Sequence, residues 1–359
     1  MSSVTLFLCG DVMTGRGVDQ ILPHPGDPRL WERDVRDAGR YVGLAEEVGG
    51  PVPRPAGFAW PWGEALAELD AVDPDVRVIN LETSITRSDD VDLGKAVHYR
   101  MAPGNTGCLT VARPDVCALA NNHVLDFGRR GLADTLDALA AAGIATTGAG
   151  RNPGEAVAPA IVPVGAARVV VFACAHWSSG VPHRWGATGE RPGVVLLPDL
   201  SDATADWVVD RVRRVKRAGD VVVVSLHWGS NWGYEVPADH VRFGHRLLDG
   251  GVDVLHGHSS HHPRGIEVHR GKLALYGCGD LVNDYEGIGG YEEYRDDLRP
   301  LYFATVDVGT GDLVDLRITP MRAHRLSLRR ASVEDAEHLR QVFGPGTRLN
   351  RDGSLRLRP

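Results

Sequence analysis

Short apolar runs that stop abruptly at metal-ligating side chains are the feature that most constrains how this chain can fold. The runs cover residues 4–9, 76–81, 116–120, 221–226 and 252–255. The side chains that follow them are Asp11, Glu82, Asn122 and His227 and, after the last run, His258 and His261. Near-continuous apolar runs of this length are typical of buried strands in α/β sheets. Because such sheets bind ligands at the carboxyl ends of their strands, we expect these side chains to meet in one site.

The chemical types of these side chains indicate a metal centre. Carboxylates, a carboxamide and neutral imidazoles suit Zn, Mn, Fe or Co. The densest stretch is VDVLHGHSSHHP at residues 252–263, which holds four histidines within seven residues. A solvated histidine-rich loop would have the same composition, but four other runs in the chain end in the same way. The sequence therefore predicts one or two divalent metal ions as cofactor, with a metal-activated water as the reactive group.

Helical patterns alternate with these runs and indicate an α/β fold. Helices are expected over residues 63–69, 128–143, 201–218, 237–248 and 332–343. Ser332 and Asp335 have the spacing of a capping box at the start of the last helix. Residues 302–328 alternate like an antiparallel hairpin, and residues 272–288 read as a sixth strand with Asp280 at its end.

The domain organisation follows from this order of elements. We expect residues 1–320 to form one domain, with residues 321–359 as a C-terminal appendage packed on it. Residues 17–61 are rich in Pro and Gly and show little periodicity. Because connections of this length are uncommon without a role, they predict a lid or substrate loop.

The charge balance and the cysteines exclude several classes of protein. Among 359 residues, 39 are basic and 47 acidic, which gives a net charge of −8. The sequence has no block of Lys and Arg to neutralise phosphates, so nucleic acid is not an expected partner. The five cysteines are scattered and odd in number, which predicts reduced thiols in the core. The N-terminal MSSVTLFLCGD lacks a basic region and reads as a first strand, so we expect neither signal peptide nor membrane anchor, and a cytoplasmic location.

Further polar residues near the predicted strand ends are candidates for catalysis and substrate binding. His123 and Asp126 lie in the polar cluster LANNHVLDFG, at a strand-to-helix turn where α/β enzymes place catalytic groups. Arg16 follows the first strand and is a candidate catalytic anion contact. The candidates for substrate contact are His176, Ser179, Trp228 and Asp280.

In its motifs, the chain resembles the bacterial capsule-synthesis family of the CapA type. This family is associated with poly-gamma-glutamate and lies within the calcineurin-like metallophosphatase superfamily. The resemblance rests on the motifs GDVMTGR, NLETSIT, LANNHVLDFG, SLHWG and HGHSSHHP, in that order, and covers residues 4–290. It implies a four-layer α/β/β/α sandwich of the metallophosphatase type, with a metal centre at the strand ends. The C-terminal β-hairpin and short helix would follow this sandwich.

The resemblance also implies roles for the candidate residues. Glu82 would bridge two metals, and His123, within reach of Asp126, would be the general acid or base. Met13 stands where the superfamily carries a histidine ligand, so the first metal would lose an imidazole and be held more weakly. The first metal would be held by Asp11 and His261, and the second by Asn122, His227 and His258.

Three functions are compatible with these residues. The first is hydrolysis of a phosphoester, or of an amide in a peptide or gamma-glutamyl chain, by a metal-activated water. The second is epimerisation of a peptide, in which the metals polarise a carbonyl and a histidine removes the adjacent Cα proton. The third is binding of an anionic chain without catalysis. All three predict a peptide or another anionic small molecule as the partner, while the sequence leaves the oligomeric state open.

Overall fold

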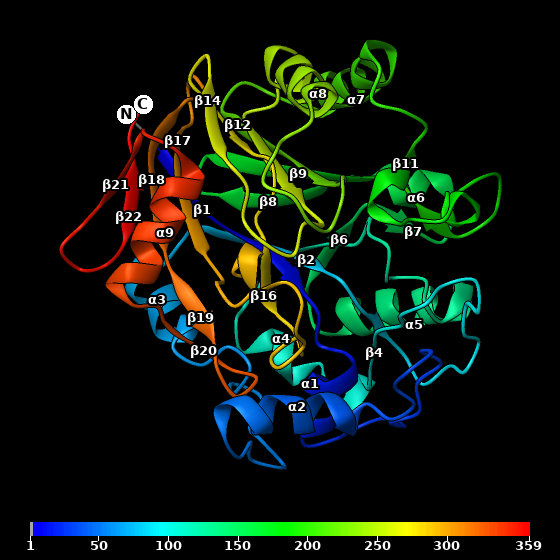
Figure 1. The fold of residues 1–359 in the computed structure, drawn as a ribbon. Helices are drawn as coiled ribbons and strands as arrows, with labels where there is room; N and C mark the ends of the chain where they lie inside the picture. The colour runs from blue at the N-terminus through cyan, green and yellow to red at the C-terminus, as the bar shows by residue number, and fades with distance from the viewer. Residues whose placement is uncertain (1–2) are drawn as a thin grey trace.

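Two large β-sheets form the centre of a mixed α/β fold in the computed structural model, which describes residues 3–359 (Figure 1). The first sheet contains, in order, β21 (Thr347–Leu349), β22 (Leu355–Leu357), β18 (Leu313–Thr319), β17 (Leu301–Asp307), β1 (Ser3–Val12), β2 (Val76–Leu81), β5 (Val116–Ala118) and β6 (Ala145–Thr147), with β16 (Asp280–Val282) paired to β1. The second contains β11 (Leu196–Leu197), β9 (Ala167–His176), β12 (Asp220–His227), β13 (Val254–His258), β15 (Lys272–Leu275) and β14 (Ile266–His269), with β8 (Ala160–Val164) paired to β9. The α/β fold class is therefore confirmed.

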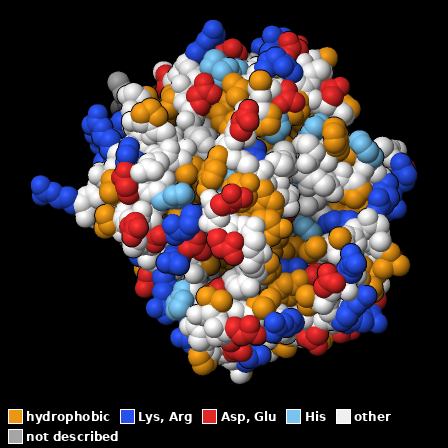
Figure 2. All heavy atoms as spheres, in the orientation of Figure 1, with side chains coloured by type: hydrophobic (Ala, Val, Ile, Leu, Met, Phe, Trp, Pro, Cys, Tyr) orange, Lys and Arg blue, Asp and Glu red, His pale blue; other side chains and the backbone are white. Residues whose placement is uncertain are grey.

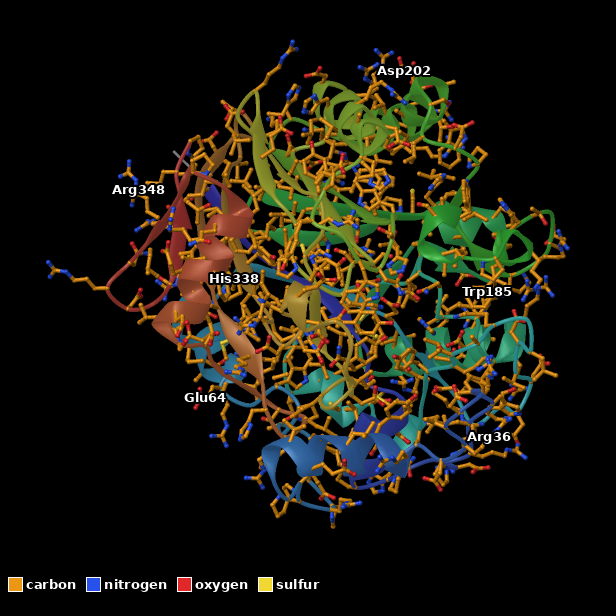
Figure 3. All side chains as sticks on the ribbon, viewed as in Figure 1. Arg36, Glu64, Trp185, Asp202, His338 and Arg348 are labelled. Carbon is orange, nitrogen blue, oxygen red and sulfur yellow. The ribbon has the colours of Figure 1, made fainter. Side chains whose placement is uncertain are left out.

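The continuous apolar runs arise because both faces of each central strand are buried. In β1, Leu6 and Leu8 belong to a cluster shared with strands of the second sheet, whereas Phe7 belongs to a cluster on the other face. In β12, Val223 faces the same shared cluster and Val222 faces away from it. The two sheets thus pack face to face, and Figure 3 shows the side chains that fill the space between the secondary structure elements.

Helices cover the outer faces of the two sheets. On the second sheet, α7 (Asp202–Val215) and α8 (Ala238–Asp249) bury Val208 and Leu247 against the strands. On the first sheet, α3 (Ala65–Val72), α4 (Gly107–Thr110) and α5 (Gly128–Ala141) contribute apolar side chains to the outer cluster. The C-terminal helix α9 (Val333–Phe343) places Phe343 in the cluster shared by both sheets.

The remaining elements are short. They are β3 (Ser84–Ile85) paired with β4 (Arg100–Met101), β7 (Ala149–Gly150) paired with β10 (Gly193–Val194), β19 (Met321–Ala323) paired with β20 (Leu328–Arg330), α6 (Pro153–Val157), and the 3-10 turns η1 (Pro103–Asn105), η2 (Trp177–Ser179), η3 (His183–Trp185) and η4 (Glu292–Tyr294). The predicted hairpin of β17 and β18 is present, as is the capping box of Ser332 and Asp335.

Two predictions about secondary structure were wrong. The segment 17–61 is not a loop throughout, because α1 (Arg16–Ile21) and α2 (Gly39–Gly49) run through it, and α2 buries Tyr41, Val42 and Ala45. The expected sixth strand is two strands, since β15 belongs to the second sheet and β16 to the first. Gly279, at φ +79°, adopts the left-handed backbone that lets the chain cross between the sheets.

The burial of the cysteines and the distribution of surface charge are as expected from the sequence. All five cysteines are buried and free. On the face drawn in Figure 2, acidic and basic side chains are interspersed and neither sign forms a broad patch. Among residues 3–359, none of the helices combines the length and the apolar character that crossing a membrane requires.

Candidate metal centre

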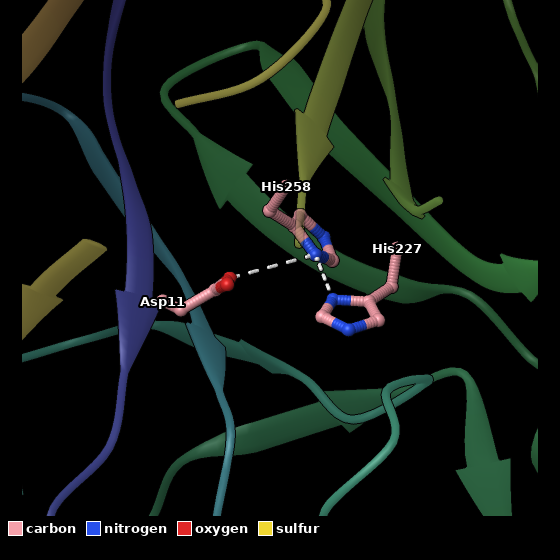
Figure 4. Close-up of side chains that lie close together, drawn as sticks. All are labelled: Asp11, His227 and His258. Atoms are coloured by element: carbon pink, nitrogen blue, oxygen red, sulfur yellow. Dashed lines mark hydrogen bonds and ion pairs between the residues drawn. The ribbon is translucent and has the colours of Figure 1, made fainter. Parts of the chain in front are cut away.

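Strand ends from both sheets meet at three buried side chains, Asp11, His227 and His258 (Figure 4). His227 and His258 are register partners at the ends of β12 and β13, and Asp11 lies near the end of β1. Nδ1 of His258 lies 2.8 Å from Nδ1 of His227 and 3.8 Å from Oδ1 of Asp11. Potential ligand atoms of the three residues all lie within 4.8 Å of one another, so they could hold one ion.

Hydrogen bonds outside this group orient the two imidazoles. Ser225 Oγ lies 2.8 Å from Nε2 of His258, which leaves Nδ1 of that ring facing the centre. Asn122 Oδ1 lies 3.0 Å from Nε2 of His227, so in this geometry the amide orients His227; its predicted role as a ligand stays a prediction. Burial lowers the pKa of both histidines well below 6.5, which keeps them in the neutral form that binds metals.

A second group of ligating atoms shares Asp11 and adds His261 and Asp280. Nδ1 of His261 lies 3.0 Å from Oδ1 of Asp280, and Asp280 is the register partner of Asp11 in the neighbouring strand. Asn283 donates to the other oxygen of Asp280 at 2.7 Å. The sequence predicted Asp280 as a substrate contact, which stays a prediction; the structure places this buried carboxylate among the candidate ligands. Sequence reasoning missed this role because Asp280 was assigned to the end of a continuous sixth strand.

Three buried carboxylates, Asp11, Glu82 and Asp280, lie close together at the centre. Asn80 Nδ2 donates to Asp11 Oδ1 at 2.7 Å and to Glu82 Oε2 at 3.2 Å, which ties two of them together. Burial, and then the charge of Asp280, raises the pKa of Asp11 to about 7. Burial and the charge of Asp11 raise the pKa of Glu82 well above 4.5. A cation among these groups would offset their repulsion, so the donor set fits a divalent metal ion.

The backbone at the end of β13 is strained next to these ligands. Ser259 follows His258 and adopts φ +101°, a region that residues other than glycine rarely occupy. This conformation directs the Ser259 N–H to Oδ2 of Asp11 at 3.2 Å. The strain therefore fixes one ligand of the centre relative to another.

His123 and Asp126 form a hydrogen-bonded pair at the edge of the centre. Nδ1 of His123 lies 2.6 Å from Oδ2 of Asp126, and Nε2 lies 3.8 Å from Oε1 of Glu82. Burial, and then the charge of Lys95, lowers the pKa of His123 well below 6.5. The sequence placed both residues of the pair correctly at the turn after β5, between Ala118 and the start of α5.

Lys95 is a residue of this centre that sequence reasoning missed. Its Nζ lies 2.5 Å from Oδ1 of Asp126 and 3.1 Å from Nδ1 of His123, and it also bonds to the carbonyl of Asn122. Lys95 lies in an irregular segment between β3 and β4, where periodicity and motif spacing give no signal. Tyr99, from the same segment, packs the edge of its ring on His123 at 4.5 Å between centroids.

Three of the predicted functional residues have other roles in the structure. Arg16 donates to Asp284 at 2.5 Å and to Glu32 at 2.9 Å, so its guanidinium is engaged in an internal ion pair, and its predicted catalytic role stays a prediction. Trp228 is 1% exposed and stacks on a buried histidine, so it packs the core, and its predicted contact with substrate stays a prediction. Ser179 is buried, with Oγ 3.0 Å from the carbonyl oxygen of His227, and therefore holds the main chain.

The fourth predicted substrate contact, His176, stays a prediction. Its Nδ1 lies 2.7 Å from Ser178 Oγ, and its buried Nε2 has no hydrogen-bond partner among the described residues. Ser178 Oγ in turn accepts from the N–H of Gly229, two residues after His227. His176 thus lies close to the main chain that carries a candidate ligand.

A cavity of about 770 Å³ adjoins the centre. Arg299 connects the two, because it lines the cavity and its Nη1 lies 3.5 Å from Oδ2 of Asp280. Tyr285 also lines it and packs edge-on against His261 at 5.1 Å between ring centroids. The charged groups on the cavity wall include Glu286, Arg295, Asp297, Arg299 and Arg322.

Fold and centre together define a mixed α/β protein with a candidate metal centre where the strands of two sheets end. The sequence model of the family described as bacterial capsule synthesis protein PGA_cap matches residues 5–285. The chain belongs to this family, which confirms the CapA-type resemblance.

Several relatives of this chain carry names that refer to polyglutamine synthesis, PGA biosynthesis or capsule biosynthesis. A probable polyglutamine synthesis accessory protein of Mycobacterium tuberculosis is 53% identical over 356 residues, which cover 99% of this chain and 93% of that protein. The PGA biosynthesis protein CapA of Bacillus subtilis is 27% identical over 231 residues, 64% of this chain and 56% of that protein. The capsule biosynthesis protein CapA of Bacillus anthracis is 23% identical over 287 residues, 78% and 60% respectively.

Proposed function

We propose that this protein is a metal-dependent hydrolase that cleaves an amide bond in a glutamyl or glutaminyl chain. The observation that carries the proposal is the position of the His123–Asp126 pair, whose free imidazole nitrogen lies 3.8 Å from Glu82 at the edge of a buried ligand cluster. The polymer is proposed from the relatives, which are named for polyglutamine synthesis and PGA biosynthesis.

The described side chains offer two metal positions. His227, His258 and Asp11 would hold one ion, and Asp11, His261 and Asp280 would hold the other, with Glu82 as the predicted bridge. In this scheme Asp280 supplies a carboxylate where Met13 removes an imidazole, so the first position keeps a complete donor set. Divalent ions there would act as Lewis acids and lower the pKa of a bound water. We also propose that the two sheets and their helical covers are the four-layer metallophosphatase sandwich.

His123 would transfer the proton during hydrolysis. Asp126 accepts the hydrogen bond of Nδ1–H, so Nε2 of the neutral ring is free to accept a proton on the side of Glu82. Water adds to the substrate carbonyl carbon, its proton passes to Nε2, and Nε2 then delivers that proton to the nitrogen of the leaving amine. The ammonium of Lys95, 3.1 Å from Nδ1, disfavours a lasting imidazolium and so favours release of the proton.

The adjoining cavity would hold the chain next to the bond that is cleaved. Arg299 reaches from the cavity wall to Asp280, so an acidic or amide side chain bound there would lie beside the metal centre. On the same wall, the exposed Arg329 would bind a further carboxylate of the polymer, whereas Arg295 and Arg322 are both paired with Asp297.

The test is incubation of the protein, loaded with Mn²⁺ or Zn²⁺, with α- and γ-linked oligomers of glutamate and glutamine in ¹⁸O-labelled water. We expect shorter oligomers that carry one ¹⁸O in the new carboxylate, and we expect this cleavage to disappear in EDTA. His123→Ala should slow the cleavage by about 10²- to 10⁴-fold, while His183→Ala, at an exposed histidine, should retain it.

Other outcomes would overturn the proposal in distinct ways. Parallel reactions in deuterated water that show one deuteron at Cα without cleavage would identify an epimerase. Release of phosphate from phosphoesters without any amide cleavage would show that the substrate is a phosphoester and not an amide. Retention of intact oligomers on the protein would identify a binding protein.

A further inference from the structure

A second cluster of ligating side chains lies on the outside of the second sheet, away from the centre described above. It consists of His245 and Asp249 on α8 and of Glu267 and His269 on β14, and we call it the α8–β14 cluster. Residues four apart on a helix share one face, and residues two apart on a strand share one face. The spacing therefore presents two side chains of the helix to two side chains of the strand.

Each histidine of the α8–β14 cluster lies within hydrogen-bond distance of a carboxylate of the same cluster. Nε2 of His245 lies 2.9 and 3.0 Å from the two oxygens of Glu267. Nε2 of His269 lies 3.0 Å from Oδ1 of Asp249. One potential ligand atom from each of His245, Glu267 and His269 lies within 4.8 Å of the other two. The imidazole rings of the two histidines stack at 3.8 Å between centroids.

A buried tyrosine orients the carboxylate at the base of the cluster. Tyr276 is 4% exposed and its hydroxyl donates to Oε2 of Glu267 at 2.6 Å. Support of this kind from a neighbouring hydroxyl is typical of carboxylates that bind metals. Oε1 of Glu267, beside Nε2 of His245, does not share this bond and is available to a metal.

We propose that the α8–β14 cluster is a second metal site, which takes a borderline divalent transition-metal ion such as Zn²⁺. Two imidazoles and two carboxylates suit Zn²⁺, Ni²⁺ and Cu²⁺, and affinity for such a set rises toward Cu²⁺. The side chains of His245 and Glu267 are 30% and 36% exposed, which gives an ion access from solvent. Each imidazole ligates a metal through its neutral form.

A metal at this site would link α8 to β14, the two elements that follow ligands of the main centre along the chain. The chain runs from His227 through a loop into α8, and from His258 and His261 through a loop into β14. A metal that joins α8 to β14 would fix the far ends of both segments. It binds the folded state alone, so it would raise the melting temperature in proportion to the logarithm of metal concentration.

The experiment separates this site from the main centre by using two backgrounds. In the full-length protein, elemental analysis after dialysis against Zn²⁺ should find one equivalent less in His269→Ala than in wild type. In a His227→Ala/His258→Ala/Asp280→Asn background, which lacks ligands of both positions of the main centre, one Zn²⁺ should remain and should be lost on adding His269→Ala. Glu267→Gln, which keeps the size of the side chain, should weaken this ion at least tenfold in calorimetric titration.

A spectroscopic measurement distinguishes loss of a metal ligand from misfolding of the variant. Co²⁺ bound to this triple variant should give visible d–d absorption that is absent when His269→Ala is added, with unchanged far-ultraviolet circular dichroism. As a matched control, His338→Ala on α9 should leave all signals unchanged. Equal Zn²⁺ content in wild type and His269→Ala, or Co²⁺ spectra that do not depend on His269, would overturn the site. Because these readouts need no substrate, they do not depend on the proposed hydrolase activity.

Discussion

Replacement of Asp11 by asparagine should stabilise the metal-free protein at pH 8. Burial and the charge of Asp280 raise the pKa of Asp11 from 3.8 to about 7 in the folded protein. The folded state therefore retains a proton that the unfolded state releases, and stability falls as the pH rises from about 4 to about 7. The full increase in the pKa of Asp11 corresponds to about 4 kcal/mol of unfolding free energy. The wild type loses this stability above pH 7, whereas a variant with a neutral asparagine does not.

The net effect also includes the hydrogen bonds of Asp11. Asparagine keeps the bond from Asn80 Nδ2 through its carbonyl oxygen, but it loses the acceptor for the N–H of Ser259, at a cost of about 1 kcal/mol. We therefore expect Asp11→Asn to be about 3 kcal/mol more stable than wild type at pH 8. At pH 5, where most of the folded wild type is protonated, the advantage should shrink by about 2 to 3 kcal/mol.

The assay is urea denaturation of EDTA-treated protein, followed by circular dichroism at both pH values. Mn²⁺ at pH 8 should then stabilise the wild type more than the variant, because the variant lacks the carboxylate that both positions of the main centre share. As a control, Asp253→Asn should destabilise the protein, because this buried carboxylate has Lys216 at 2.7 Å and Lys272 at 3.1 Å. An Asp11→Asn variant that is less stable than wild type by the same amount at both pH values would refute the reasoning.

Three further predictions concern the centre. His227→Ala and His258→Ala should each lose the ion held by Asp11, His227 and His258, whereas Asp280→Asn should lose mainly the ion held by Asp11, His261 and Asp280. Elemental analysis of dialysed protein measures these losses, and equal loss from all three variants would indicate one coupled site. His123→Ala should slow turnover by about 10²- to 10⁴-fold with metal content unchanged, and loss of metal in this variant would argue against an acid–base role. Metal affinity should fall as the pH drops below about 7, because Asp11 must release its proton to bind; calorimetric titrations at pH 6 and pH 8 test this.

The sequence determined where the strands end and which polar side chains follow them. Strands buried on both faces favour apolar residues at most positions, so the runs before Asp11, Glu82 and His227 could be recognised without knowing their neighbours. The helix after His123 and the capping box at Ser332 could also be predicted, because both depend on residues close in sequence. The metal-ligating types of the side chains were visible for the same reason.

Only the tertiary structure decided which of these side chains meet and what lies between them. Asp280 joined the ligands because β16 pairs with β1 in the first sheet, although the apolar pattern around it continues from β15 in the second. Lys95, in an irregular segment, forms an ion pair with Asp126, and Arg16 forms one with Asp284, which is 268 residues away in sequence. Such contacts depend on the path of the chain between elements, and electrostatic pairing across that distance leaves no periodic pattern in the sequence.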